Sequence, residues 1–159
     1  EILLPDGRPG IYNIVQKEAA VWILPVTTEN QIVLIRSYRY AVDDWCWEIP
    51  AGSLKAGQTP AEAALAELAE EVGGEAQQLD YLGQSYMANG ICDEVGQFFL
   101  ATGVTLGEPD HEAAEVIEVH LKSIPEVLQM ARANEINDAP SALVILLCAE
   151  RLGAMANNQ

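Results

Sequence analysis

The chain has 159 residues, of which 50% are hydrophobic, so its length suits one well-packed domain and not two. Acidic residues outnumber basic ones by 24 to 8, which gives a formal net charge of -16. Nucleic acids and anionic membranes bind basic surfaces, so this balance argues against both as partners. It does not exclude a phosphorylated small molecule, provided that metal ions neutralise the repulsion between like charges.

The cysteines and the apolar runs indicate where the protein works. Cys46, Cys92 and Cys148 are odd in number and lack metal-ligand spacing, so we interpret them as reduced thiols in a cytoplasmic protein. We see no signal peptide and no apolar run long enough to span a bilayer. The apolar residues 141–149 are therefore interpreted as a buried helix.

The first third of the chain predicts turns followed by strands. Residues 1–10 are rich in proline and glycine and predict an edge segment or a contact with a partner. Residues 11–17 are a candidate strand, and the apolar runs 19–27 and 31–40 predict a β-hairpin. Pro25 cannot donate to a strand ladder, so we expect an edge position or a bulge there.

Later segments predict further strands and two C-terminal helices. Ser123 and Glu126 form an S-x-x-E capping box, which predicts a helix ending near residue 133. A final helix is expected over residues 139–152, ending at Gly153. Strands are expected at residues 46–49, 77–87, 95–102 and 115–121. We therefore predict one domain over residues 1–159, of the α/β (α+β) class, with a mixed sheet and helices on both faces.

Residues 48–74 form the most strongly marked stretch of the chain. Thr59 is placed to cap a helix, Pro60 suits its first position, and Glu62 completes a T-x-x-E capping box. Gly73 supplies a left-handed stop. Apolar residues recur at helical spacing in between, so the segment predicts a Gly-rich loop followed by an amphipathic helix.

Glu67, Glu70 and Glu71 lie side by side on this predicted helix. Like charges at this spacing destabilise a helix by about 0.2–0.5 kcal/mol per pair, and no Lys or Arg lies between residues 56 and 74 to offset them. A solvated acidic face is one interpretation. The other is a site for a hard divalent cation, which takes carboxylate oxygens and the carbonyl of a nearby loop.

The stretch from Gly52 to Gly74 resembles the Nudix box, G-x5-E-x7-R-E-U-x-E-E-x-G-U, where U is a bulky apolar residue. Most fixed positions match at the right spacing, and the departures are Gln58 for Glu, Ala66 for Arg and Gly74 for the last apolar residue. The flanking segments EIPAG, RSYRY, NGICDE and EINDAPSALVILLCAERL are similar to the ADP-ribose pyrophosphatase branch. The resemblance covers most of the chain.

The resemblance implies an αβα sandwich around a mixed sheet, a homodimer, and cleavage of nucleoside diphosphate compounds with Mg²⁺ or Mn²⁺. Glu67 and Glu71 then bind the metal, helped by Glu70 and the carbonyl of Ala51. Glu70 also counts among the catalytic residues. The base that activates water is expected in the acidic loop 108–115, where Glu115 matches best and Glu112 is the alternative. A solvated acidic loop is the competing interpretation of both, and we expect His111 at the surface.

Three further residues are candidates for substrate binding. Arg39 resembles the substrate-facing Arg of the branch, with a strand-end ion pair as the alternative. Glu48 either faces the substrate or anchors the loop. Trp45 lies at a loop end and is a candidate for stacking on a nucleobase.

The departures from the family pattern leave the exact substrate and the state of the loop open. Gln58 and Ala66 replace an ion pair that braces the family's loop, and because both partners are lost together we expect a looser or differently braced loop. Asn89 stands where the branch commonly has proline. The predicted reaction is hydrolysis of ADP-ribose to AMP and ribose 5-phosphate. The alternatives are another nucleotide-sugar pyrophosphatase, such as one acting on GDP-mannose, and a non-catalytic nucleotide-binding domain.

Overall fold

The computed structural model describes residues 1–111 and 115–157, and its centre is a mixed sheet of eight strands. These strands are β3 (Ala20–Thr27), β4 (Gln31–Arg39), β5 (Asp44–Glu48), β6 (Ala51–Ser53), β7 (Gly74–Glu75), β8 (Gln78–Tyr86), β9 (Val95–Leu106) and β10 (Ile117–Ser123). The order is β10-β4-β3-β9-β7, with β5 beside β4, β6 beside β3 and β8 beside β9. The central pair β3–β9 is parallel and the other pairs within this sheet are antiparallel.

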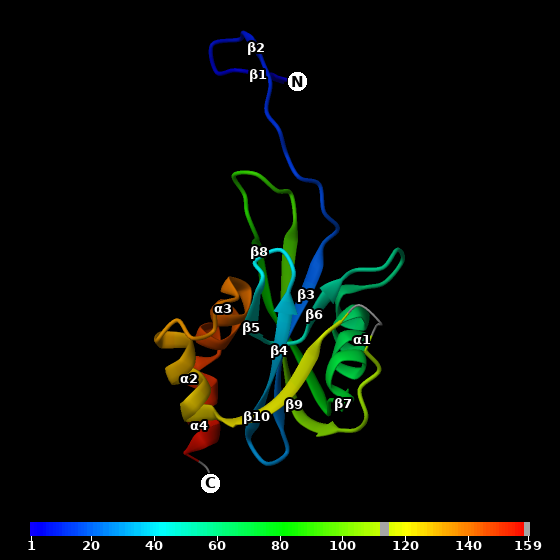
Figure 1. Cartoon of the computed structure of the whole chain (residues 1–159), viewed down its shortest axis with the longest axis vertical. Helices are drawn as coiled ribbons and strands as arrows, with labels where there is room; N and C mark the ends of the chain where they lie inside the picture. The colour runs from blue at the N-terminus through cyan, green and yellow to red at the C-terminus, as the bar shows by residue number, and fades with distance from the viewer. Residues whose placement is uncertain (112–114, 158–159) are drawn as a thin grey trace.

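Helices cover both faces of the sheet (Figure 1). On one face lies α1 (Pro60–Val72), and on the other lie α2 (Ile124–Arg132), α3 (Ala139–Leu147) and α4 (Ala149–Ala156). Side chains alternate along each strand, so Val33 and Ile35 of β4 join the core under α1, whereas Ile32 and Leu34 join the core under α2–α4. The predicted αβα sandwich is confirmed.

Both predicted capping boxes begin helices. The Thr59 hydroxyl accepts the Glu62 N–H over 3.3 Å, and the Glu62 carboxylate accepts the Thr59 N–H over 2.8 Å. At the start of α2 the Ser123 hydroxyl likewise accepts the Glu126 N–H, but the Glu126 carboxylate pairs with Lys122, so this helix has the predicted N-cap without the reciprocal half of the box. Gly73 ends α1 with φ 64, the left-handed conformation that glycine adopts without steric cost.

Pro25 lies in the middle of the sheet, so the expected edge position is wrong. β3 pairs with β6 over residues 20–22 and with β4 at Val26, and Pro25 lies in the interval between these two ladders. No ladder bond is needed from its missing N–H there, which is why a central strand tolerates it. The expected irregularity is present, because the β3–β9 register shifts between Val26 and Thr27.

The C-terminal helix is broken, contrary to the prediction of one helix over residues 139–152. It is interrupted at Cys148, where α3 and α4 meet at 59°, and α4 continues through Gly153 to Ala156. Among the described helices, none alone is long and apolar enough to cross a membrane; α3 and α4 together meet such a test by length and composition only. Cys46, Cys92 and Cys148 are free thiols, and the first and last of them are buried.

The N-terminal segment extends away from the body of the molecule (Figure 1). Its two short strands, β1 (Ile2–Leu3) and β2 (Pro9–Gly10), pair with each other and not with an edge of the main sheet. Residues 11–17 form no regular strand, and an isolated bridge joins Val15 to Cys92. Several apolar side chains of this segment are exposed, among them Leu3 at 77% and Ile11 at 83%.

Candidate active site

One buried hydrogen bond ties the Gly-rich loop to helix α1. The Ala51 N–H donates to the Glu71 carboxylate over 2.9 Å, and Glu71 is only 4% exposed. Burial raises the pKa of the Glu71 carboxyl to about 8; the Ala51 N–H opposes this shift, while the nearby Glu67 and Glu115 add to it. A carboxylate held among like charges in this way is stabilised by a cation beside it.

Gly52 makes room for a second carboxylate. A Cβ built on Gly52 would coincide with the carboxylate of Glu67, so any side chain at this position would displace Glu67. A cavity of about 290 Å³ opens here, lined among others by Glu67, Glu70 and Glu115. The missing side chain therefore lets helix α1 bring an acidic group directly against the loop.

Lys55 offsets part of the acidic charge of α1, and this ion pair was not predicted from the sequence. This residue lies just before the region found to lack basic side chains, and its Nζ is 3.5 Å from the Glu70 carboxylate. Both side chains are substantially exposed, so the pair contributes little to stability. Its effect is to hold Glu70 toward the loop.

The oxygen donors suit a divalent cation, although they are not gathered around one point. Within residues 1–111 and 115–157, no three His, Cys, Asp or Glu side chains converge closely enough to hold a metal ion. Glu71 instead accepts from Ala51, and Glu70 pairs with Lys55. Carboxylates beside a backbone carbonyl are nevertheless the ligand set that Mg²⁺ prefers, and the space above Gly52 lets Glu67 reach the strand end.

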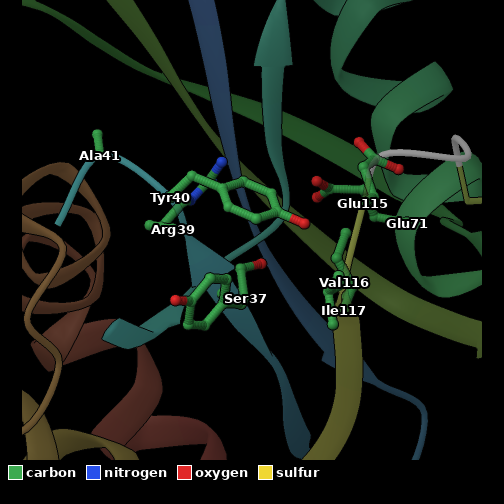
Figure 2. A pocket seen from close by; sticks show the side chains of 9 residues that line it. Ser37, Arg39, Tyr40, Ala41, Glu71, Glu115, Val116 and Ile117 are labelled. Atoms are coloured by element: carbon green, nitrogen blue, oxygen red, sulfur yellow. The ribbon is translucent and has the colours of Figure 1, made fainter. Parts of the chain in front are cut away.

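Glu115 approaches the site from the segment before β10. With Glu71 and Arg39 it lines another cavity of about 290 Å³ (Figure 2), and it also lines the carboxylate cavity described above. The structure thus brings the better-matching candidate base next to the helix carboxylates. Glu112, the alternative, lies outside the described residues.

The loop that leads to Glu115 is anchored on the C-terminal end of α1. His111 Nε2 donates to the Glu71 carbonyl over 2.8 Å, and the Asp110 N–H donates to the Glu70 carbonyl over 2.8 Å. His111 is half-buried by this contact, whereas the sequence suggested a surface residue. Helix-end carbonyls need such partners, so Asp110 and His111 complete the C-terminal end of α1.

Arg39 and Glu48 form a two-pronged ion pair. Arg39 Nε lies 2.7 Å from Glu48 Oε1, and its Nη2 binds Oε2. Burial raises the pKa of Glu48 while Arg39 opposes the shift, and the hydrogen bond to Glu48 raises the pKa of Arg39. Both residues line a cavity of about 460 Å³. Arg39 therefore forms the strand-end ion pair given as the alternative to substrate binding, and it also lines a cavity that a substrate could enter.

A second ion pair lines this cavity, and it was not predicted from the sequence. Lys17 Nζ lies 2.6 Å from Glu94 Oε1, and the Lys17 N–H donates to Asp93 over 3.0 Å. These contacts attach the N-terminal segment to the loop before β9. The one signal in the sequence that could have drawn attention to Lys17 is the scarcity of basic residues, of which the chain has 8.

Trp45 does not face the cavity that holds Arg39. Side chains alternate along β5, so Trp45 points away from the face that carries Glu48. Its ring lies 5.8 Å from the Tyr38 ring, with the Arg36 guanidinium 5.4 Å from its centre. Trp22 packs on the core and also lines the cavity that holds Arg39.

Gln58 braces the loop from within. Its side-chain oxygen accepts the Lys55 N–H over 3.0 Å, and its own N–H donates to the Lys55 carbonyl over 3.1 Å. Ala66, which replaces the usual partner, is half-buried on α1. Hydrogen bonds within the loop therefore brace it, in place of an ion pair to position 66. This is the different bracing expected from the loss of both partners.

Comparisons with known proteins agree with this geometry. The NUDIX domain model matches residues 16–143. This chain belongs to the Nudix family. It is 33% identical over 147 residues to the ADP-ribose pyrophosphatase of Bacillus subtilis (strain 168), covering 91% of this chain and 80% of that protein. It is 31% identical over 150 residues to the methanol dehydrogenase activator of Bacillus methanolicus, with the same coverage.

The fold comparison agrees with the family. A crystal structure of an ADP compounds hydrolase matches with a TM-score of 0.83 over 96% of this chain and 83% of that one; at 21% identity the match shows the fold alone. The chain is a Nudix hydrolase, an enzyme of a family that acts on small nucleotide substrates and generally uses divalent metal ions.

Replacing Glu71 with Gln tests the role of its charge without disturbing the fold. Glutamine keeps an oxygen that accepts the Ala51 N–H, so the metal-free variant should unfold at or above the wild-type temperature. Saturating Mg²⁺ or Mn²⁺ should raise the Tm of the wild type, by about 2.7 kcal/mol of stabilisation at a hundredfold excess over Kd, and Glu71→Gln should lose most of that shift. Calorimetry with the exposed Glu135→Gln as control makes the measurement, and an undiminished shift in Glu71→Gln would contradict the assignment.

Proposed function

We propose that this Nudix hydrolase cleaves ADP-ribose to AMP and ribose 5-phosphate with Mg²⁺ or Mn²⁺. The observation that carries the proposal is the group of helix carboxylates beside the Ala51 strand end: Glu67 and Glu70 line one cavity with Glu115, and Glu71, which binds the Ala51 N–H, lines a second cavity with Glu115. The relative from Bacillus subtilis and another from Mycobacterium tuberculosis, 33% identical over 120 residues, are both named ADP-ribose pyrophosphatase, which supports this choice of substrate.

In this proposal Glu67, Glu70, Glu71 and the Ala51 carbonyl hold the divalent cation. Such a cation, when bound, neutralises the pyrophosphate oxygens and lowers the pKa of a bound water. The chain itself contributes a buried carboxylate whose position is fixed by the Ala51 N–H. Gly52 carries no side chain, so oxygen donors and the pyrophosphate can approach the loop backbone closely.

Glu115 is the proposed base, which takes a proton from the attacking water. It lies in the segment before β10 and lines both of the cavities that the α1 carboxylates line, so it adjoins the place proposed for the cation. Arg39 and Lys17 face the 460 Å³ cavity and supply its positive charge. We propose that they bind the phosphate and sugar oxygens of the substrate, with Glu48 fixing the Arg39 fork.

We further propose that the enzyme is a homodimer joined through its N-terminal segment. Leu3 is 77% exposed and Ile11 83% exposed on a segment that extends from the body (Figure 1). Tyr12 and Ile14 line an apolar groove with Tyr86, also exposed. Exposed apolar side chains gathered in this way mark a protein interface, and a second copy offers the same surface in return.

Hydrolysis assays test the proposed reaction. ADP-ribose, GDP-mannose and other nucleoside diphosphate compounds are incubated with the enzyme and Mg²⁺ or Mn²⁺, and monophosphate release is measured. ADP-ribose should give the highest kcat/KM, and Glu115→Gln should lower kcat by about 10²–10⁴ with little change in KM, as expected for a lost general base. Glu108→Gln in the same acidic loop is the matched control. Unchanged kcat in Glu115→Gln would reject the base, and faster turnover of GDP-mannose would reject the substrate.

Truncation of the arm tests the dimer. Removing residues 1–11, or replacing Ile11 and Ile14 with Asp, should convert the protein from dimer to monomer, because a charge at a buried apolar contact is costly. Light scattering after gel filtration measures the mass, with the exposed Glu18→Gln as control. A truncated protein that stays dimeric, or a monomeric wild type, would exclude this interface.

A further inference from the structure

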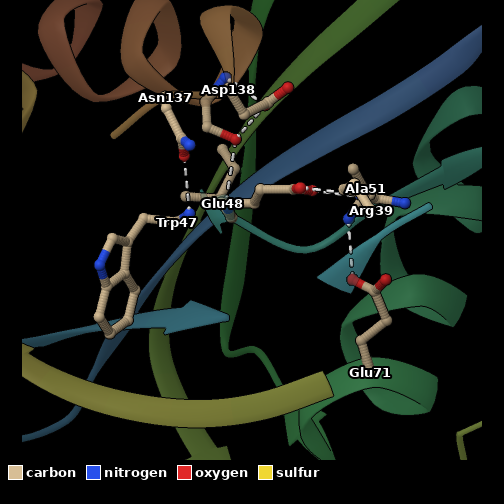
Figure 3. A network of polar contacts seen from close by, with 9 residues as sticks. Arg39, Trp47, Glu48, Ala51, Glu71, Asn137 and Asp138 are labelled. Carbon is tan, nitrogen blue, oxygen red and sulfur yellow. Dashed lines mark hydrogen bonds and ion pairs between the residues drawn. The ribbon is translucent and has the colours of Figure 1, made fainter. Parts of the chain in front are cut away.

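Each residue from Trp47 to Ala51, where the strand end enters the active-site loop, makes a hydrogen bond or an ion pair; Figure 3 shows those of Trp47, Glu48 and Ala51. Glu48 binds Arg39, the Pro50 carbonyl accepts the Ile23 N–H over 2.9 Å, and the Ala51 N–H binds Glu71. The two remaining contacts come from the opposite layer of the molecule, at the start of α3, and involve the backbone N–H groups of Trp47 and Ile49.

Two side chains at the start of α3, those of Asn137 and Ser141, make these contacts, and Asp138 supports the second of them. Asn137 Oδ1 accepts the Trp47 N–H over 3.0 Å, and Ser141 Oγ accepts the Ile49 N–H over 3.0 Å. The Ser141 hydroxyl donates to Asp138 Oδ2 over 2.5 Å, so its lone pairs are directed at Ile49. Ser141 and Ile49 are both 0% exposed, so no solvent replaces this bond, and a buried N–H left without an acceptor is strongly disfavoured.

Glu48 lies between the two fixed N–H groups, and Ala51 follows two residues after the second. The intervening Pro50 has a locked φ, so a shift at Trp47 or Ile49 is passed along the chain and not absorbed there. Asn137 and Asp138 also line the cavity that holds Arg39 and Glu48. The residues at the start of α3 therefore contact the backbone of the strand end and also line the cavity that holds Arg39 and Glu48.

We infer that Asn137, Asp138 and Ser141 are positioning residues of the hydrolytic site: they fix where Glu48 and the Ala51 backbone lie, and so couple the C-terminal helices to catalysis. The inference rests on the proposed function only for its effect on turnover. Asn137 is the informative member. It is exposed, it stands before the N-cap Asp138 and does not cap α3 itself, and its side chain bonds to the strand. Helix capping alone does not account for it.

Amide hydrogen exchange tests the inference without any assay of activity. In Asn137→Ala, exchange at the Trp47 and Ala51 amides should quicken by about 2- to 12-fold, the rate equivalent of one lost neutral hydrogen bond, while amides within α1 and β9 keep their wild-type rates. Asn137→Asp retains an acceptor oxygen and should restore protection at both amides. Glu135→Ala, exposed in the same turn without a contact to β5, is the control. Wild-type exchange at Ala51 in Asn137→Ala would overturn the inference.

Kinetics provide the second readout. With the substrate that the wild type hydrolyses best, Asn137→Ala should lower kcat/KM by about 10–100-fold, the usual loss when a supporting residue is removed from a catalytic site, with its Tm close to that of Glu135→Ala. Faster Ala51 exchange with unchanged kcat/KM would show that the turn is structural only. If the wild type hydrolysed no nucleoside diphosphate compound, the proposed function would fail while the exchange result still decided whether the turn positions Ala51.

Discussion

The hydrogen bond from the Ala51 N–H to the buried Glu71 carboxylate is the contact on which the site depends. It joins the strand end to α1, and each partner is held in turn by another layer of the sandwich. His111 binds the Glu71 carbonyl from the loop before β10, while Ser141 fixes Ile49 just ahead of Ala51. Two further segments, far apart in sequence, thus hold Glu71 directly and Ala51 through Ile49, which preorganises the oxygen donors before any ligand binds.

Charge imposes the second constraint. The chain has a net charge of -16, and three of its basic side chains, Lys17, Arg39 and Lys55, pair with carboxylates around the site. These pairs hold positive charge in place but leave little of it uncompensated. An anionic pyrophosphate entering this region meets net negative charge, so its binding depends on divalent cations more than on the chain's own basic groups.

Local signals predicted the features that depend on neighbouring residues. The capping box at Thr59, the stop at Gly73 and the carboxylate spacing on α1 are written in consecutive positions, and the family match added the roles. Contacts between distant segments were beyond this reasoning. The pairing of Lys17 with Glu94, the anchoring of His111 and the turn at Asn137 depend on how layers pack. Trp45 lies on the face of β5 opposite to Glu48, and its role in stacking on a nucleobase stays a prediction. The break at Cys148 has no proline or glycine to mark it.

Anomalous diffraction from crystals grown with Mn²⁺ would locate the metal site itself. We expect a manganese peak within coordination distance of Glu67, Glu71 and the Ala51 carbonyl, with oxygen ligands at about 2.0–2.2 Å for a hard divalent ion of this type. The same peak should vanish in Glu71→Gln crystals. A strong peak elsewhere, with none between α1 and the strand end, would contradict the assignment of this stretch as the metal site.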